Sequence, residues 1–543
     1  MALIAEPRGH LAGWRTIAGC FAAILLVCDA QAQPAEPAAD VQISAAKNAT
    51  APKPPPLQIL AAIDFSETYT SNAGGNTGFG LSAGDAYTRA RLNLGVRYNM
   101  GPVNLQANYA LIADKYAQFS QLDNYTNRLN LAADATLIPE QLVVQGSAFA
   151  APALLNRVGA ISAGGEPISN IDNRDSYGYV VEPRYFLRIG DYASSTTSVS
   201  KGDIFFVSPS TSNLGVPTLI PPVQDSASFS VREQIKSGTY FSQIQWDLTL
   251  SRSEMTQVSN TQTQEDGVAD ISYQLNRHAA LLASGGYSAF RSSSTLSRDL
   301  SGPAALGGFK FSYGPTFTLT AQAGERNRYP TYIGSLLWAI TAMTKVTGSL
   351  TDAIGTPQND ILANLSNLAA GIDTAAPNYA APTSPTAEQA LAPQLSTVSP
   401  ISSQGLALDN SINRERRTTI SLLHESVRTQ YSLTLVKDTR DRLDLAGTLF
   451  NPHTSLYSVN AMITRKMRTN LTSYVSASYS LAHEFGGEDR ILGAEAGVSY
   501  TMSDTLSLYL TNRYLHRDLN GVIGVPNAPL DDDEVVLGIR KAF

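Results

Sequence analysis

The sequence predicts an all-β chain that forms a single closed antiparallel transmembrane β-barrel of about 22 strands, within a range of about 18 to 24. Two observations support this fold class. Segment after segment alternates apolar and polar residues over ten or more positions, which is the length that a tilted membrane-crossing strand requires. Charged residues make up only 16% of the chain, and no long apolar run follows the N-terminal region.

The alternation is clear in residues 89–98. Leu92, Leu94 and Val96 occupy one parity, and Arg91 and Arg97 occupy the other. Similar stretches follow at 103–111, 128–137, 240–251 and 471–481. A soluble β-sandwich also alternates, but it does not need so many strands of this length.

Connections between the expected strands differ in length. Short turns such as 99–102, 190–191 and 502–504 alternate with longer, irregular loops. Barrels that cross the outer membrane have short periplasmic turns and long extracellular loops. Strands expected from 59–70 to 534–543 give an even count, which places both chain ends in the periplasm.

The N-terminus predicts export. Arg8 and Arg15 precede an apolar segment at 17–27, and small residues flank a cleavage position at 30–32. We therefore expect residues 1–32 to be a cleaved signal peptide. A retained anchor is the alternative, but the apolar segment is short for a membrane-spanning helix. The only cysteines, Cys20 and Cys28, lie within this signal.

Three further segments are expected after the signal. Residues 33–56 are rich in alanine and proline and predict an unpacked periplasmic leader. Residues 57–543 form the barrel. Within it, 354–408 is a long insertion with a short helical pattern at Ile361, Leu362, Leu365 and Leu368. A connection of this length is functional or disordered, and it could fold into the lumen or lie outside as a lid.

The chain ends in an alternating stretch that closes on Phe543, with Val535, Leu537 and Ile539 on one parity. This ending resembles the terminal strand of Gram-negative outer-membrane β-barrels, although Lys541 departs from the pattern. The resemblance implies location in the cell outer membrane, contact with its lipid, and recognition of Phe543 by the barrel-assembly machinery.

A narrower resemblance lies at the start of the barrel. The segment 64–72, which reads DFSETYTSN, resembles the opening of the PEP-CTERM-system-associated outer-membrane barrel family, with Ser71 in place of its usual aspartate. Weaker similarities lie at 431–435 and 465–471. The resemblance implies association with exopolysaccharide loci and carries over no catalytic residue.

Signals for chemistry are scarce. His424-Glu425 and His483-Glu484 are fragments of a zinc-protease motif, but neither has a second histidine four residues later. We expect no catalytic residue, no metal, no cofactor and no enzyme activity. The net charge of −7 gives no support for nucleic-acid binding.

Arginines on the polar parity are the residues that carry functional information, because a charge facing lipid near the midplane costs about 2–4 kcal/mol. Two readings stay open. The arginines pair with inward carboxylates and stabilise the wall, or they line a passage that favours anionic or hydroxyl-rich solutes. The expected lumen-lining arginines are Arg89, Arg91, Arg97, Arg128, Arg184, Arg188, Arg417 and Arg513.

We therefore predict a conduit or accessory pore for exopolysaccharide export, with polysaccharide and periplasmic export components as partners. The alternatives are a general porin or a structural or adhesive surface barrel without transport. Residues 33–56 are too few for the plug domain that receptors with 22-stranded barrels carry, so only 354–408 is large enough to fill the lumen.

Overall fold

The structure is a computed structural model that describes residues 56–73, 83–154, 173–207, 225–257, 260–293, 300–356, 358, 362, 412–443, 453–484, 487–521 and 529–543. The compact unit within it spans Pro56–Phe543. The expected signal and most of the expected leader, at residues 1–55, lie outside the described residues.

This unit consists of 22 β-strands and one short 3-10 helix, η1 (Ser120–Leu122). The strands are β1 (Leu57–Thr70), β2 (Asp85–Met100), β3 (Val103–Tyr116), β4 (Asn124–Ile138), β5 (Leu142–Leu154), β6 (Asn173–Ile189), β7 (Ala193–Val207), β8 (Ser226–Ser237), β9 (Ile244–Gln257), β10 (Thr261–Asn276), β11 (Ala279–Ser292), β12 (Gly302–Tyr313), β13 (Phe317–Arg326), β14 (Tyr329–Thr341), β15 (Thr344–Gly355), β16 (Asn413–Glu425), β17 (Thr429–Arg442), β18 (His453–Arg468), β19 (Leu471–Glu484), β20 (Gly487–Ser503), β21 (Leu506–Asn520) and β22 (Leu530–Ala542).

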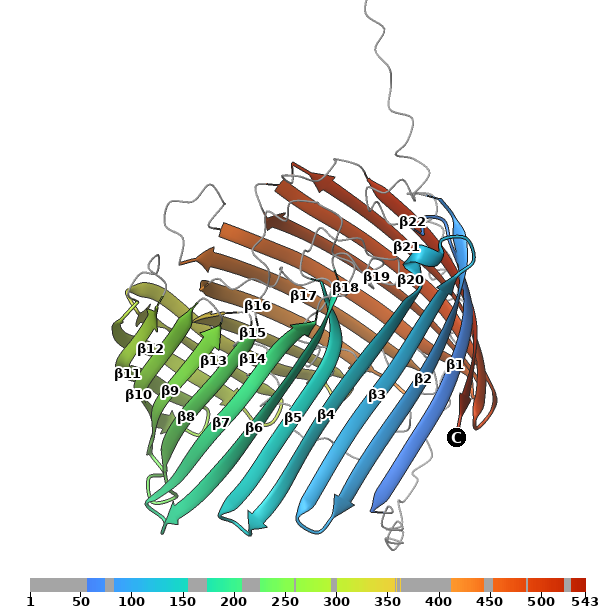
Figure 1. Cartoon of the computed structure of the whole chain (residues 1–543). Coiled ribbons are helices and arrows are strands. Elements are labelled where there is room, and N and C mark those ends of the chain that lie inside the picture. The colour runs from blue at the N-terminus through green and yellow to red at the C-terminus, as the bar shows by residue number, and fades with distance from the viewer. Residues whose placement is uncertain are drawn as a thin grey trace, which may run out of the picture. The chain divides into compact units, whose positions relative to one another are not determined.

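Each strand pairs antiparallel with the next along the chain, and β22 pairs with β1, so the sheet closes on itself (Figure 1). Closure matters because an open sheet edge in hydrocarbon leaves backbone groups without partners. The predicted closed antiparallel barrel of about 22 strands is therefore confirmed. No helix among the described residues is long and apolar enough to cross a membrane.

The two faces of the wall follow from the alternation. In β22 the side chains of Val535, Leu537 and Ile539 are exposed, while Glu534 and Arg540, which flank them on the other parity, are buried. Residues opposite one another in a ladder project to the same face, so the register carries this assignment from strand to strand. One face is apolar and turned outward to lipid, and the other is polar and turned inward.

Short turns gather at one end of the barrel. Gly101, Gly190 and Gly314 each have positive φ, of 62°, 55° and 57°, in the turns after β2, β6 and β12. Such backbone favours glycine because it has no Cβ. This end is the periplasmic end in barrels of this class, and the longer connections lie at the extracellular end.

One tight hairpin lies among the extracellular connections. Asn327 and Arg328 join β13 to β14 with φ of 54° and 67°. Two successive residues with positive φ match the twist of the flanking strands, and asparagine tolerates this conformation better than most residues. The hairpin holds the extracellular ends of β13 and β14 together.

The chain end is anchored beside the barrel's first strand. The Phe543 N–H donates to the carbonyl of Ala61 on β1 at 2.8 Å, and its ring is 68% exposed. Lys541, the departure from the expected terminal pattern, directs its Nζ to Thr505 at 2.7 Å in the turn before β21. The last strand therefore both closes the barrel and presents its terminal aromatic ring at the periplasmic end.

Candidate functional site: the inner wall and its contact with the long connection

The inner face of the barrel carries a large set of ionisable side chains. The ladder places each of the arginines singled out from the sequence on the parity opposite to the exposed apolar residues: Arg89, Arg91, Arg97, Arg128, Arg184, Arg188, Arg417 and Arg513. Most of them have polar partners within the described wall.

Arg89 on β2 is bound by Asp114 on β3. Its Nε and one terminal nitrogen reach the two carboxylate oxygens at 2.6 and 2.8 Å. The side chains are 20% and 12% exposed, so the pair is mostly shielded from solvent. Planar two-point pairing of this kind fixes both side chains in place. The pair crosslinks adjacent strands.

Arg184 pairs with a carboxylate on its own strand. Its Nε lies 2.7 Å from Glu182, two residues earlier on β6. Arg188, nearer the periplasmic end, lies 3.1 Å from Asp191 in the following turn. That pair is solvent-exposed, and such pairs contribute little to stability.

Arg417 belongs to a four-residue network on β16 and β17. It lies 2.9 Å from Asp438 and 3.2 Å from Glu415, and Arg440 lies 3.7 Å from Asp438 and 3.5 Å from Glu415. Two cations and two anions therefore alternate across one ladder. The network is electrically balanced, and its Asp438 is fully buried.

Arg513 stands between two carboxylates near the closure of the barrel. Its guanidinium lies 3.5 Å from Glu495 on β20 and 3.6 Å from Glu534 on β22. The hydroxyl of Tyr474 donates to Glu495 at 2.6 Å, which extends the row to β19. This row joins four neighbouring strands through side chains as well as through the ladder.

Arg97 differs from these residues. It lies on the inner face near the periplasmic end of β2, and no carboxylate in the described part of the chain lies within ion-pair distance of it. Its charge is therefore less compensated than that of Arg89. The sequence left two hypotheses open for these arginines. Arg89, Arg184, Arg417 and Arg513 fit the first, in which the arginines pair with inward carboxylates. Arg97 fits the second, in which an arginine presents its charge to the lumen.

A residue of the long connection after β15 contacts the inner wall at strands that lie far from β15 in the sheet. Leu362 is buried in one apolar cluster with Phe149, Val180, Ile204 and Met255. These four side chains come from β5, β6, β7 and β9, and each lies on the inner face. Leu362 follows the end of β15 at Gly355 by seven positions, and its contact with these side chains places it inside the lumen.

Two described neighbours of Leu362 support this path. The Thr356 hydroxyl lies 3.5 Å from the Met255 sulfur, and the side chain of Gln358 is fully buried. Gly202 on β7 leaves room for Leu362, because a Cβ there would lie 3.0 Å from its Cδ2. The other residues of the expected helical pattern, Ile361, Leu365 and Leu368, lie outside the described residues.

Sequence reasoning missed the apolar residues that receive Leu362. The available signal is that Phe149, Val180, Ile204 and Met255 are large and apolar at positions where neighbouring strands place polar residues. An apolar residue on the inner parity of a wide barrel needs a partner inside the lumen. Leu362 is that partner.

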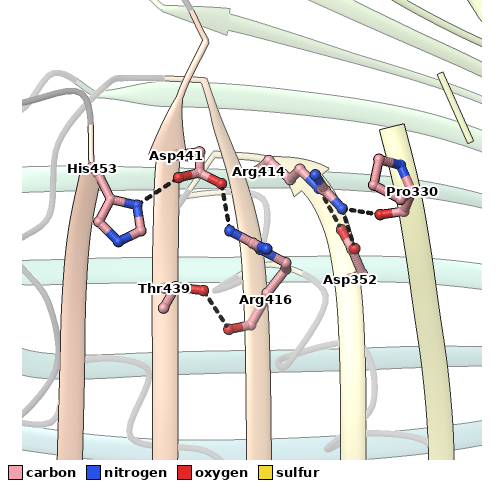
Figure 2. Close-up of polar contacts among 7 residues, drawn as sticks. All are labelled: Pro330, Asp352, Arg414, Arg416, Thr439, Asp441 and His453. Atoms are coloured by element: carbon pink, nitrogen blue, oxygen red, sulfur yellow. Dashed lines mark hydrogen bonds and ion pairs between the residues drawn. The ribbon is translucent and has the colours of Figure 1, made fainter. Parts of the chain in front are cut away.

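A second group that the sequence did not reveal lies between β14 and β18 near the extracellular end (Figure 2). Arg416 lies 2.8 Å from Asp441, and Nδ1 of His453 lies 2.6 Å from the same carboxylate. Arg414 on β16 binds Asp352 on β15 and the carbonyl of Pro330 on β14. The signal for it is Arg414 and Arg416 themselves, which occupy the apolar parity of β16.

No family model matches the chain, so the resemblance of 64–72 to the PEP-CTERM-associated family stays a prediction, and no curated protein matches it in sequence. Solved structures that resemble it include the FrpB iron transporter from Neisseria meningitidis (F3-3 variant), with 8% identity over 89% of this chain and 81% of that one and a TM-score of 0.47.

Two others are similar. The ferric-catecholate import receptor Fiu from E. coli K12 has 10% identity over 89% of this chain and 81% of that one, with a TM-score of 0.46. FpvA of P. aeruginosa, bound to heterologous pyoverdines, has 9% identity over 89% and 72%, with a TM-score of 0.47. At this level of identity, what these receptors bind is a property of those proteins alone.

The closed barrel with a lipid-facing apolar exterior defines the class of protein. This chain is a β-barrel of the Gram-negative outer membrane, because membrane-spanning closed barrels with short turns at one end belong to that membrane. The predicted location is confirmed.

Proposed function

We propose that this barrel is a gated conduit that passes a large hydrophilic solute across the outer membrane. A closed sheet of 22 strands encloses more space than the 16–18 strands of porins, which leave an aqueous channel. A lumen of that width needs something to fill or gate it. The packing of Leu362, a residue of the connection after β15, against inner-face residues of β5, β6, β7 and β9 is the observation that carries the proposal.

The chemistry of the inner wall supports a hydrophilic cargo. Inward hydroxyls and amides lie among the ion pairs, for example Ser200 with Ser230, and Gln234 with Asp247. Such groups exchange hydrogen bonds with hydroxyl-rich solutes at small cost, because each can bind either water or a sugar hydroxyl. The resemblance of 64–72 to an exopolysaccharide-associated family makes an exopolysaccharide the solute class we propose.

The extent of ion pairing favours a second candidate function. Arg89, Arg417 and Arg513 are all bound to carboxylates, so these arginines stabilise the wall whether or not anything passes. In a structural or adhesive barrel the lumen stays closed, and the extracellular loops do the binding. The two functions differ in what happens when the contact of Leu362 is lost.

Genetic deletion separates the two candidates. The chromosomal gene is removed and the strain is complemented with the wild-type chain or with Leu362→Ser. The conduit predicts that released exopolysaccharide falls in the deletion strain and returns with the wild-type chain. It also predicts increased sensitivity to large antibiotics with Leu362→Ser, because a serine does not fill the apolar cluster.

A matched control is Leu122→Ser. Leu122 is as buried as Leu362, but it packs with Ala73, Tyr116 and Phe119 and not with the cluster that receives Leu362. It should leave antibiotic sensitivity unchanged. Exopolysaccharide release that is untouched in the deletion strain, together with lost adhesion, would replace the conduit by the surface-binding function.

A further inference from the structure

One junction in the barrel wall is incompletely paired. Pairing between β14 and β15 runs only from Gly334 with Leu350 to Thr341 with Thr344. It is the shortest register of any junction between the described strands. Toward the extracellular end, β14 continues to Tyr329 and β15 continues to Gly355 without pairing to each other. Both strands keep their other neighbours, β13 and β16.

Arg414 bridges this gap with its side chain (Figure 2). Its Nε donates to Asp352 on β15 at 2.8 Å, and a terminal nitrogen donates to the carbonyl of Pro330 on β14. The guanidinium also lies 5.1 Å from the ring centre of Tyr329. Arg414 and Asp352 are 7% and 4% exposed at their side chains, so the bridge is almost sealed from solvent.

The bridge gives the Pro330 carbonyl a hydrogen-bond partner at the point where the β14–β15 ladder is interrupted. It is also easier to open than a ladder. Separating two paired strands breaks many backbone hydrogen bonds together, whereas swinging Arg414 away from Pro330 breaks a side-chain contact at one point. The junction is therefore held shut by a latch and not by the sheet.

A small cavity lies behind the latch. Its lining combines the apolar side chains of Phe290, Tyr329 and Ile354 with the guanidinium groups of Arg326 and Arg414. Phe290 and Ile354 continue into an apolar cluster with Leu300 and Ile412. Arg326 lies 2.8 Å from Asp266 on the inner face of β10. The cavity thus joins an apolar surface to cationic groups at the inner wall.

We propose that the extracellular part of the β14–β15 junction is a lateral gate between the lumen and the outer leaflet, latched by Arg414, for an amphiphile with an anionic headgroup. The apolar part of such a molecule packs against Phe290 and Ile354 on the lumen side of the junction. Its headgroup replaces Asp352 and Asp266 on the two guanidinium groups. This route is independent of the solute that the lumen passes along its axis.

The latch is tested by hydrogen–deuterium exchange of the full chain in lipid nanodiscs. Arg414→Gln should accelerate amide exchange about tenfold or more at 329–333 and 351–355, as expected when a charge-assisted hydrogen bond is lost. Arg417→Gln, three residues along the same strand, removes an inner-wall ion pair and should leave those peptides unchanged. Equal exchange in wild type and Arg414→Gln, or equal acceleration by both variants, would overturn the latch.

The route is tested with a phosphatidic acid that carries a photoactivatable group in its acyl chain. Adducts should form on peptides that contain Phe290, Tyr329 or Ile354, and increase severalfold in Arg414→Gln. Phosphatidylcholine with the same group should give few. A thiol crosslinker between Thr331→Cys and Ala353→Cys should abolish these adducts, because these positions would face each other if the register of Gly334 with Leu350 continued.

The matched control is Ser335→Cys with Ser349→Cys, a pair that already faces across the paired part of the same junction. Crosslinking it should leave the adducts intact. Adducts that survive the Thr331–Ala353 crosslink, or that form equally with phosphatidylcholine, would show lipid contact from outside the wall and would overturn the lateral gate.

Discussion

The hydroxyl of Thr356 lies 3.5 Å from the sulfur of Met255, although the two residues are 101 positions apart in the chain. Met255 stands on β9, and Thr356 is the first residue after β15. The contact holds Thr356, which directly follows β15, against the inner face of a different part of the barrel. Leu362 then packs into the cluster that Met255 shares with Ile204.

A double-mutant cycle tests this contact. Leu362→Ala and Met255→Ala should each lower the thermal midpoint of the folded barrel, because each leaves a cavity in the same cluster. The double variant should lose less than the sum of the two, with a coupling of about 0.5–3 kcal/mol, since the residues share partners. Strict additivity would contradict the contact.

Arg97 should influence ion selectivity more than a paired arginine does. Arg97→Gln removes an inner-face charge that has no described carboxylate partner, so anion preference in bilayer recordings should fall. The double variant Arg89→Gln with Asp114→Asn removes a balanced pair and should leave selectivity unchanged while lowering stability. A larger selectivity change in the double variant than in Arg97→Gln would exclude this assignment.

Gly538 allows the barrel to close. A Cβ at this position on β22 would lie 2.2 Å from Cζ of Tyr509, whose hydroxyl donates to Asp64 on β1 at 2.6 Å. Gly538→Ala should displace the ring and cost about 1–3 kcal/mol. The midpoint of heat-modifiable mobility measures the loss. Gly307→Ala, where a Cβ has no heavy atom within 4 Å, is the control and should have no effect.

Phe543 should act as an assembly signal. Deleting it removes the exposed ring and the hydrogen bond to Ala61, and we expect less protein in the outer membrane with unchanged export across the inner membrane. Phe543→Trp keeps an aromatic ring and should retain most of the wild-type level. Quantitative immunoblots of separated membranes measure both, and a normal level after deletion would remove Phe543 from the assembly signal.

The two faces of the barrel wall were predictable from sequence because they depend on residues that are adjacent in the chain. A strand that separates lipid from a polar lumen must alternate, and the parity of Leu92 and Leu94 places Arg89 and Arg91 on the inner face. Counting the alternating segments along the chain gives the even number of strands. These features need no knowledge of distant residues.

The contacts across the barrel were not predictable in the same way. The sequence contains the apolar pattern around Leu362, but nothing in it says which of the inner faces receives that side chain. The split between β14 and β15 is equally hidden, since Asp352 and Arg414 are separated by the whole connection in the chain. Such pairings depend on closure of the complete barrel.

Single-channel conductance of the purified protein in planar bilayers tests the gated conduit most directly. The account predicts that the wild-type chain shows small or infrequent openings, because the connection held by Leu362 obstructs the lumen. Leu362→Ser should give openings several times larger, of the size expected for a wide barrel, and Leu122→Ser should behave as wild type. Identical small conductance in all three proteins would contradict a gate at Leu362 and leave a closed structural barrel.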